Sequence, residues 1–359
     1  MMKIGKILFA LFLCSAVLVS CGGGTVPVPA SEPASAAETE TAAPVTTEEE
    51  TTAVDLPAAR ERISVRVMSF NIHGMNRKTS TMEYGNGGTT GIEEEVDATV
   101  ATRGPKFRQL LRGEAIDIAG LQEWKSDVWG TWWDSHADSK YGIVVYYTHG
   151  TQEGGAVLYL KSRFTPVENG MFWLIEGTPA KWKSAATNQY SDSNWDRTCT
   201  WALFQEKATG NYFIFCDTHL DTNSSAAEKQ AKVLSERIES LRTELKQKYE
   251  LSYTLPEILV GDMNSTPSSN AYPLLISYLR DSRDMSQGTT VSSQISTSPW
   301  YSHCNTEADY VANGHRIDYI FVSHAVKVTN YWMVHTSTNL CPYGAYLSDH
   351  NAVIADLYF

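Results

Sequence analysis

Short polar motifs recur along this chain, each at or just past the end of a strand-like apolar run. The last of them puts an Asp directly before a His, and alternating apolar residues follow to the C-terminus. One such motif occurs by chance, but an ordered series constrains the fold, because both ends of a long segment must then meet at one site. The motifs are Ser69-Phe70-Asn71-Ile72, Leu121-Gln122-Glu123, Asp217-Thr218-His219-Leu220, Gly261-Asp262-Met263-Asn264, Arg316-Ile317-Asp318-Tyr319 and Ser348-Asp349-His350-Asn351.

This ordered set resembles the endonuclease/exonuclease/phosphatase superfamily, the DNase I-like metal-dependent phosphohydrolases. The resemblance covers nearly all of the chain from Val65 to Phe359. It is strongest at Gly261–Asn264 and at the last two motifs, and weakest between Gly74 and Pro105. It implies an α/β (α+β) fold, a four-layered αββα sandwich. In this fold two mixed β-sheets pack face to face, helices lie outside them, and the site lies at one end.

The N-terminus has the features of a targeting segment. Lys3 and Lys6 flank its start, and Ile7–Val19 is almost wholly apolar but short for a membrane span. The segment ends in Leu18-Val19-Ser20-Cys21, which looks like a bacterial lipobox with Cys21 as the lipidated first mature residue. We therefore predict a lipoprotein signal peptide over 1–21 and an extracytoplasmic protein, lipid-anchored to a bacterial membrane. An ordinary secreted protein cleaved nearby is the alternative.

Residues 22–61 contain Gly, Pro, Ala, Ser, Thr and Glu with almost no bulky apolar side chains. Such a composition cannot bury enough apolar surface to offset the entropy of ordering, so we predict a disordered acidic tether. The remaining residues, 62–359, are predicted to form one catalytic domain, because the motifs span them and no Pro/Ser-rich linker interrupts them. We expect this domain to act as a monomer.

The charge of the predicted domain bears on its substrate. Of the 29 basic and 41 acidic residues, three and eight fall within 1–61, which leaves 26 and 33, a net charge of −7, on 62–359. No basic stripe with interleaved aromatic residues is visible, so a surface that follows the phosphates of a nucleic acid is not favoured. A nucleic-acid substrate stays open, because a bound metal ion can supply positive charge locally.

Strand and helix patterns agree with this architecture. A long helix is predicted over 225–250, where Ser225 and Glu228 have the spacing of a capping box. A shorter helix is predicted over Pro105–Arg112, with Pro105 in its first turn. Runs rich in β-branched and aromatic residues predict the strands. They are Val65–Ile72, Ala115–Gln122, Tyr141–Tyr147, Gly155–Lys161, Phe172–Glu176, Thr198–Gln205, Tyr212–Asp217, Ile258–Gly261, Arg316–Val322 and Ala352–Phe359.

Hydrolysis of a phosphate ester needs a Lewis acid on the non-bridging oxygens and a water placed in line. A hard cation such as Mg²⁺ (or Mn²⁺) takes one or two carboxylates and keeps several waters, so few protein ligands are expected. The resemblance makes Glu123 the first metal ligand, puts Asn71 beside metal and phosphate, and lets Asp349 help to hold the metal. By themselves, Glu123 could be a surface residue in a strand-to-loop turn and Asn71 a turn residue.

Asp262 and Asn264 lie two residues apart after a predicted strand. Alternation in an extended segment would point both side chains the same way. One could then take a proton from water while the other holds the phosphate or the metal. The resemblance assigns Asp262 as the general base or second metal contact and Asn264 as its partner. An Asx-turn before Thr266-Pro267 is the plain structural alternative.

Two histidines are predicted to reach the site. The resemblance makes His350 an oriented, partly cationic imidazole that contacts the scissile phosphate, and Asp349 is the carboxylate expected to set its tautomer. It makes His219 a phosphate-contacting or leaving-group-stabilising residue. It makes Asp318 the acidic residue that orients His219 or completes the metal site. The other seven histidines, His73 among them, are expected to be structural or on the surface.

Further residues near the motifs carry weaker expectations. Arg197 precedes a strand and is a candidate phosphate clamp, with a salt bridge to Asp192 or Asp196 as the alternative. Asp217 stands where many relatives have Asn, so it would add a carboxylate near the site and alter metal preference. Residues 75–103 resemble an insertion that rims the site. Four tryptophans offer either a stacking surface or core anchors: Trp124, Trp129, Trp132 and Trp133.

A disulfide is predicted between Cys199 and Cys216. If residues 207–211 close a hairpin, the two cysteines lie at near-opposite positions on adjacent antiparallel strands. Directly opposed residues there have Cα atoms within roughly 4.5–5.5 Å, which is inside disulfide range. An extracytoplasmic location permits oxidation. The alternatives are two plain core thiols, or a shifted register that separates them.

These features predict a divalent-metal-dependent phosphoester hydrolase, either a phosphodiesterase or a phosphomonoesterase. Its expected substrate is a small phosphate ester or a phospholipid head group. A secreted metal-dependent nuclease is the first alternative. A non-catalytic surface-binding module that kept the fold is the second, although such a module would have no need for the full set of polar motifs.

Overall fold

The computed structural model describes residues 61–74, 77–79, 96–148, 153–176, 197–288, 315–336, 341–344 and 347–359. The predicted signal peptide with Cys21, almost all of the tether over 22–61, and much of the predicted insertion over 75–103 lie outside these residues. From the last of these segments, β2 (Arg77–Thr79) and β3 (Val96–Ala98) pair as a small antiparallel sheet.

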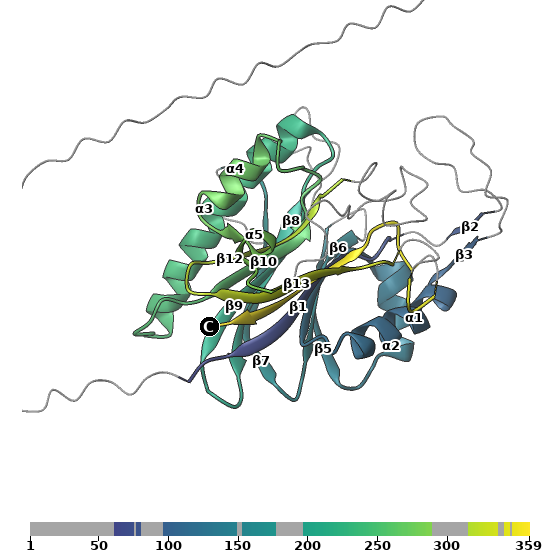
Figure 1. Ribbon diagram of the computed structural model, residues 1–359, viewed down its shortest axis with the longest axis horizontal. Helices are drawn as coiled ribbons and strands as arrows, with labels where there is room; N and C mark the ends of the chain where they lie inside the picture. Colours follow the sequence, from purple (N-terminus) through teal and green to yellow (C-terminus); the bar gives the residue numbers. More distant parts are fainter. Residues whose placement is uncertain are drawn as a thin grey trace, which may run out of the picture. The chain divides into compact units, whose positions relative to one another are not determined.

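The predicted αββα sandwich is confirmed. Two mixed six-stranded sheets pack face to face, and helices cover their outer faces (Figure 1). The first sheet has the order β13-β14-β1-β4-β6-β5, and β1 and β4 are parallel in it. Its strands are β1 (Ser64–Asn71), β4 (Ile118–Lys125), β5 (Tyr141–Tyr147), β6 (Glu153–Leu160), β13 (Lys327–Val334) and β14 (Ala352–Tyr358).

The second sheet has the order β11-β12-β10-β9-β8-β7, and β9 and β10 are parallel in it. Each sheet therefore has a central parallel pair flanked by antiparallel neighbours. The strands are β7 (Phe164–Trp173), β8 (Thr198–Glu206), β9 (Tyr212–His219), β10 (Glu257–Asp262), β11 (Arg280–Asp281) and β12 (Asp318–Val322).

Strand alternation sorts the apolar side chains into separate cores. On β1, Val65 and Val67 pack between the two sheets, whereas Met68 and Phe70 face the helical layer. That layer holds α1 (Val100–Gly113), a π-helical turn η1 (Ser126–Gly130) and α2 (Thr131–His136). The second sheet packs against the layer formed by α3 (Ser224–Lys248) and α4 (Ala271–Ile276), and the short α5 (Ser282–Met285) contacts β12 and β13.

The four tryptophans within and after β4 are core residues. Trp124 and Trp129 have no exposed surface, and Trp132 and Trp133 are 7% and 5% exposed. Their rings pack edge-on and stacked against one another and against Phe107 of α1. The idea that they form a stacking surface for a ligand is therefore wrong, because they anchor η1 and α2 onto the first sheet.

The two predicted helices form with different ends. The capping box at Ser225 is wrong: Asn223 is the N-cap of α3, and its side-chain oxygen accepts hydrogen bonds from the backbone of Ser225 and Ala226. Helix α1 begins at Val100, so Pro105 lies inside it rather than in its first turn. The helix accepts this proline because burial of Phe107 and Leu110 outweighs one lost backbone hydrogen bond.

Two strands are displaced from their predicted bounds. Ala115 has φ +51 and forms a left-handed turn after α1, so β4 begins later than predicted, at Ile118. Strand β7 extends from Phe164, although Pro166 and Gly170 weaken its strand propensity. It is an edge strand, where proline is tolerated, and a bulge after Pro166 keeps it paired with β8.

The hairpin of β8 and β9 forms as predicted, but the disulfide does not. Gln205 pairs with Tyr212, and this register places Cys199 opposite Thr218 and Cys216 opposite Trp201. The two cysteines are thus diagonal neighbours on the helix-facing side, where Cα atoms lie roughly 7–8 Å apart, beyond ordinary disulfide reach. Both are free, fully buried thiols in the core beneath α3.

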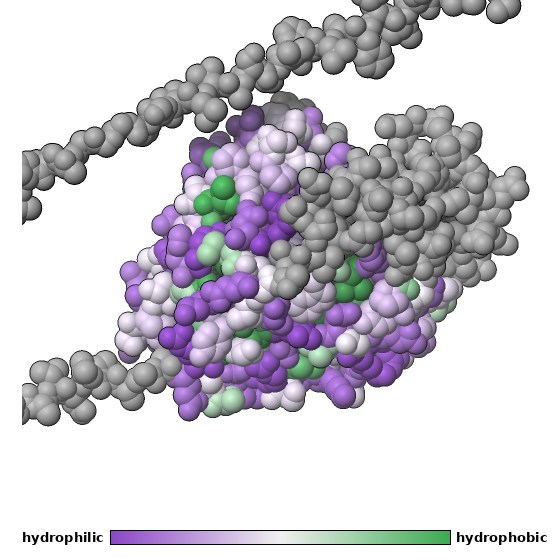
Figure 2. All heavy atoms as spheres, viewed as in Figure 1, coloured by the Kyte–Doolittle hydropathy of each residue, from purple (hydrophilic) through white to green (hydrophobic). Residues whose placement is uncertain are grey.

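The outer surface of the described domain is mostly polar. Figure 2 shows apolar side chains scattered singly among hydrophilic ones on the face in view. The exposed large apolar side chains among the described residues are Val167, Ile276, Met285 and Tyr358, each 36–41% exposed. None of the described helices combines the length and the apolar character needed to cross a bilayer.

Candidate active site

Three side chains of the second sheet meet at one end of the sandwich. Strands β9 and β10 are parallel, so both finish at this end, and the antiparallel β12 begins here. In this register Asp262 lies directly opposite His219 on one side and Asp318 on the other. All three side chains point into the space between the sheets, because they continue the inward-facing positions of their strands.

The first sheet supplies the other half at the same end. Asn71 is the last residue of β1 and pairs with Gln122 of the parallel strand β4. Glu123 is the next residue of β4. A bulge between Leu121 and Trp124 interrupts pairing with β6, and Glu123 itself has φ +58, a left-handed conformation rare outside glycine. His350 lies just before β14, which runs antiparallel to β1.

Asn71 joins the two halves. Its side-chain amide nitrogen donates to Asp262 Oδ2 over 3.0 Å and to Glu123 Oε1 over 3.1 Å. Asn71 is fully buried and Asp262 is 1% exposed, so the bond between them is shielded from water. One amide therefore ties a carboxylate on the first sheet to a carboxylate on the second.

Glu123 is held from a second direction. The backbone N–H of Gly74 donates to its Oε2 over 2.8 Å, while the side chain stays partly exposed. A Cβ on residue 74 would lie 2.7 Å from the carbonyl oxygen of Glu123, so only glycine allows this close approach. The carboxylate is thus oriented by its contacts and still open to solvent.

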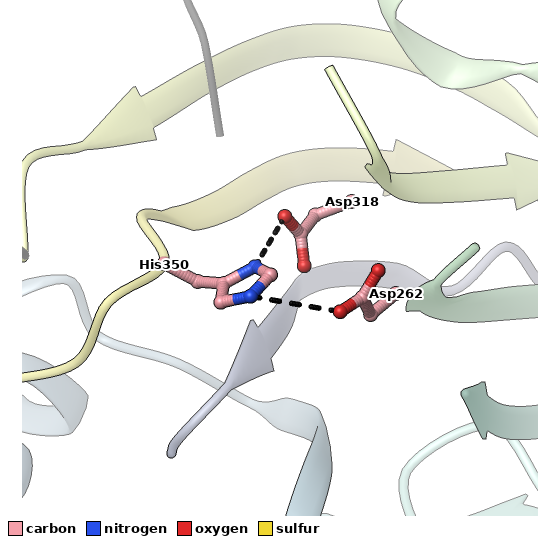
Figure 3. Close-up of side chains that lie close together, drawn as sticks. All are labelled: Asp262, Asp318 and His350. Carbon is pink, nitrogen blue, oxygen red and sulfur yellow. Dashed lines mark hydrogen bonds and ion pairs between the residues drawn. The ribbon is translucent and has the colours of Figure 1, made fainter. Parts of the chain in front are cut away.

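His350 lies between the two buried carboxylates (Figure 3). Its Nδ1 is 2.8 Å from Asp318 Oδ2, and its Nε2 is 3.6 Å from Asp262 Oδ2. Burial opposes charging of the imidazole, but Asp318 and Asp262 outweigh it and raise the pKa of His350 well above its usual value. This shift favours the imidazolium form, in which Nδ1 donates to Asp318.

The prediction that Asp349 orients His350 is therefore wrong. Of the two roles expected for Asp318, it orients His350 in place of His219, and the cluster of Asp262, Asp318 and His350 is compatible with the other role, in a metal site. Asp349 and His350 lie in a bend before β14, where their side chains meet different partners. Asp349 instead pairs with His73, Oδ1 to Nδ1, over 3.2 Å. Burial favours the neutral carboxyl, but His73 outweighs it and holds the pKa of Asp349 below its usual value.

His73 is the site residue that sequence reasoning set aside as structural. It lies two residues past Asn71, has φ +59, and donates its backbone N–H to Asn71 Oδ1 over 3.1 Å. The available signal was its position in Asn71-Ile72-His73 at the end of a strand. Ser348 completes this corner, since its hydroxyl donates to the carbonyl of Asn71 over 2.6 Å and accepts from the backbone of His350.

Asn264 reaches the site by a turn and not by strand alternation. Strand β10 ends at Asp262, and Asn264 has φ +44, with its backbone N–H donating to Asp262 Oδ1 over 2.9 Å. This is the Asx-turn given above as the alternative. The turn is compatible with a place in the site, because the Asn264 amide donates to the Leu220 carbonyl and lies 3.0 Å from His219 Nε2.

His219 is the meeting point of three groups. Its Nε2 is 3.0 Å from the Asn264 amide, 3.2 Å from Arg197 Nη2 and 3.4 Å from Asp262 Oδ2. Arg197 is buried, so its guanidinium belongs to the site rather than to the surface. Its predicted alternative partners, Asp192 and Asp196, lie outside the described residues.

Asp217 does not reach the site. It points into the core between the sheets, where it is fully buried and accepts a hydrogen bond from Gln122 over 2.6 Å. Two glycines make room for it, since a Cβ at Gly120 or Gly155 would lie 2.7 Å or 2.6 Å from its oxygens. Burial raises the pKa of Asp217 well above its usual value. This shift favours the neutral carboxyl, and its place in the core keeps Asp217 from acting as an additional metal ligand.

The residues present fit a hard divalent cation. Glu123, braced by a backbone N–H and the Asn71 amide and open to water, offers the sparse oxygen set that Mg²⁺ prefers. The buried cluster of Asp262, Asp318 and His350 could also bind such an ion, with ligand atoms within 4.8 Å of one another. We favour Glu123, because an imidazolium has no lone pair to give to a metal until it loses its proton.

Comparison with known proteins agrees with the fold. A model of the Endonuclease/Exonuclease/phosphatase family matches residues 68–350. An endonuclease/exonuclease/phosphatase family protein from Bacteroides thetaiotaomicron superposes with a TM-score of 0.60 and 24% identity, over 84% of this chain and 97% of that one. No curated protein sequence matches the chain.

Two further solved structures share the fold. A mannosyl-6-phosphatase from Bacteroides thetaiotaomicron has a TM-score of 0.59 and 23% identity, over 82% of this chain and 100% of that one. TDP2 of D. rerio, complexed with a single-strand DNA product, has a TM-score of 0.55 and 16% identity, over 82% and 99%. At these identities the likeness shows a common fold.

Proposed function

Because the chain belongs to the endonuclease/exonuclease/phosphatase family, we propose that it is a hydrolase of phosphate esters that uses a divalent cation, Mg²⁺ or Mn²⁺. The observation that carries this proposal is the bridge made by Asn71 between Glu123 and Asp262. The bridge places the oriented, solvent-accessible carboxylate of Glu123 beside Asp262. Asp262 is buried and faces His219 and His350. Such a site can bind a cation and a phosphate together.

Each residue has a role that follows from its contacts. A cation held by Glu123 and Asn71 would supply a Lewis acid for the phosphate oxygens. His350 donates a hydrogen bond from Nε2 to a phosphate oxygen, and Asp318 keeps the proton on Nδ1. Asp262 is ionised, since His219 and His350 outweigh its burial and lower its pKa, so it can orient the attacking water and accept its proton.

The remaining polar groups bind the phosphate. Asn264 and Arg197 converge at His219, and their N–H groups suit the non-bridging oxygens of a phosphoryl group. His219 then lies where it can stabilise either these oxygens or the leaving oxygen. This arrangement uses both sheets, so the site exists only in the packed sandwich.

A small phosphate ester or a phospholipid head group is the substrate that the charge favours. The net charge of −7 on 62–359 would repel a long polyanion at a distance. The mannosyl-6-phosphatase with the same fold supports a small substrate. The DNA complex of TDP2 keeps a nuclease as the second candidate, because it shows that this fold accommodates a single strand.

We further propose that the domain works outside the cytoplasmic membrane, as a monomer held by a lipid on Cys21. The support is the sequence Leu18-Val19-Ser20-Cys21 after an apolar segment, followed by a polar stretch long enough to serve as a tether. A lipid anchor would place the site near membrane head groups without requiring a membrane-spanning helix.

A substrate screen with Mg²⁺ and Mn²⁺ tests the proposal. Sugar phosphates, inositol phosphates, phospholipids and single-stranded DNA are compared for wild type and Glu123→Ala. We expect hydrolysis that excess chelator abolishes and that Glu123→Ala lowers by a factor of ~10²–10³. Full activity in excess chelator would contradict the metal role. Preference for DNA would favour the nuclease, and binding of a phosphate ester without turnover would favour a non-catalytic module.

A further inference from the structure

A buried arginine lies directly beneath the site and is absent from the machinery described so far. Arg103 is on α1 and only 1% exposed. Its Nη1 donates to three backbone carbonyls: Ile72 over 2.8 Å, His73 over 3.0 Å and Leu347 over 3.3 Å. These carbonyls belong to segments that are far apart in sequence, the end of β1 and the segment before β14.

Trp129 fixes the guanidinium in place. The Arg103 guanidinium carbon lies 4.9 Å from the centre of the Trp129 ring, and Trp129 is fully buried. The indole Nε1 also donates to the His73 carbonyl, over 3.0 Å. Arg103 and Trp129 therefore hold the same carbonyl from two elements of the helical layer, α1 and η1.

Each clamped segment carries groups of the site. Just past His73, the Gly74 N–H orients Glu123. Just past Leu347, Ser348 bonds the Asn71 carbonyl and the backbone of His350. His73 itself pairs with Asp349, which joins the two segments across the clamp. A shift of either segment would thus move the oxygens that hold a cation and the imidazole that meets the phosphate.

Charge supports the same assignment. Burial lowers the pKa of Arg103 to about 10, while Asp349 and Glu123 counteract that effect, so the guanidinium stays charged at neutral pH. The positive charge of Arg103 is thus held in place behind two carboxylates that it attracts.

We propose that Arg103 is a positioning residue of the site. It locks 71–74 and 347–350 into one register and thereby orders Glu123, Asp349 and His350. Its effect on metal binding rests on the proposed function, whereas its effect on backbone order does not. Residues that orient ligands in this way typically change metal affinity or activity 10–100-fold when they are lost.

Three variants of the full chain test this. Arg103→Met removes all three carbonyl bonds. Arg103→Lys should rescue part of the effect, because one nitrogen makes all three bonds and an ammonium has three donors. Arg112→Met is the matched control, since Arg112 lies on the same helix, pairs with Asp138 and has a side chain 54% exposed.

Two measurements separate positioning from general stability. Hydrogen exchange of peptides covering 71–74 and 347–351 should accelerate at least tenfold in Arg103→Met, less in Arg103→Lys, and not in Arg112→Met. Titration calorimetry with Mn²⁺ should show a dissociation constant raised about 10–100-fold in Arg103→Met. If Arg103→Met does not fold, Trp129→Phe removes one bond to the His73 carbonyl and should raise exchange of 71–74 alone.

Unchanged exchange in the two segments, or an equal rise across the whole domain, would overturn the inference. Selective loosening of both segments would uphold it, even if the wild type bound no Mn²⁺. That last result would count against the proposed metal-dependent function only.

Discussion

At the scale of single residues, this site shows how one buried contact sets the chemical state of its neighbour. His350 is charged because Asp318 and Asp262 face its two ring nitrogens. Burial in the core raises the pKa of Asp217, two residues from His219 in the chain, although Gln122 and backbone N–H groups donate to its carboxyl. Two buried aspartates therefore differ, since the facing histidines favour the ionised form of Asp262 and burial favours the neutral form of Asp217.

The first prediction concerns catalysis. His350→Ala and Asp262→Asn should lower kcat by a factor of ~10²–10⁴ and change KM little, because both groups act on the transition state. Steady-state kinetics on the substrate found in the screen, at saturating metal, measure this. A rise in KM alone would mean that these two residues only bind the substrate.

The second prediction concerns pH and Asp217. Its folded pKa is raised, so the carboxyl keeps its proton in the folded protein after the unfolded chain has lost it. Stability is therefore undiminished below the unfolded pKa of about 4 and falls as pH rises toward the folded pKa. Asp217→Asn removes this loss, so the variant should gain up to ~1.4 kcal/mol over wild type per pH unit in that interval.

Urea unfolding at several pH values between 4 and 8 tests this, with Asp284→Asn as a surface control. An advantage that does not change with pH would show that Asp217 is ionised in the folded protein. A large loss of stability in Asp217→Asn at all pH values would show that the carboxyl is needed for its shape in the core and not only tolerated as a neutral group.

At the scale of secondary-structure elements, local sequence signals give the type of an element better than its ends. The strands Tyr141–Tyr147 and Ala352–Tyr358 agree with their predicted bounds or nearly so. Helix α3 was expected from its apolar face, which lies in the core as predicted. The predicted start of α3 was wrong because Asn223 and Ser225 are both good N-cap residues. Only the path of the chain from β9 decides which of them caps the helix.

The third prediction separates these two caps. Asn223→Ala should lower the free energy of unfolding by ~0.5–2 kcal/mol, because two backbone N–H groups lose their acceptor. Ser225→Ala, inside the first turn, should change it by less than ~0.5 kcal/mol. Equal losses in the two variants, measured by urea unfolding, would restore the capping box at Ser225.

At the scale of the whole molecule, the site depends on the packing of one sheet on the other. The Asn71–Asp262 bond joins residues on different sheets that are 191 apart in sequence. The clamp at Arg103 adds the helical layer to this assembly. Activity should therefore be lost in the same transition as the global fold, since neither sheet alone carries both carboxylates.

The fourth prediction concerns the whole chain in the cell. Cys21→Ala should release the protein from the membrane fraction, because the lipid is its only proposed anchor. Labelling with a radioactive fatty acid and cell fractionation measure this. A wild-type protein that takes up no label would refute the lipid anchor and favour simple secretion.

From its sequence alone, the chain determined the fold class, the position of most strands and the set of polar residues at their ends. The strand and helix positions follow from periods of two and of 3.6 residues, which are local. The fold class followed from the resemblance of the ordered polar motifs to a known family. That Asn71, Asp262 and His350 meet was implied by the family resemblance, which places strand-end residues of both sheets at one site.

Tertiary structure alone decided which groups pair. Asp318 orients His350, and His73 pairs with Asp349. Asp217 lies in the core, and Cys199 and Cys216 are offset by two residues in the register of β8 and β9. Each outcome depends on strand register or on the contact of two sheets, and a shift of one or two residues would change it. Local sequence patterns carry no information about that register, because it is fixed by packing between segments far apart in the chain.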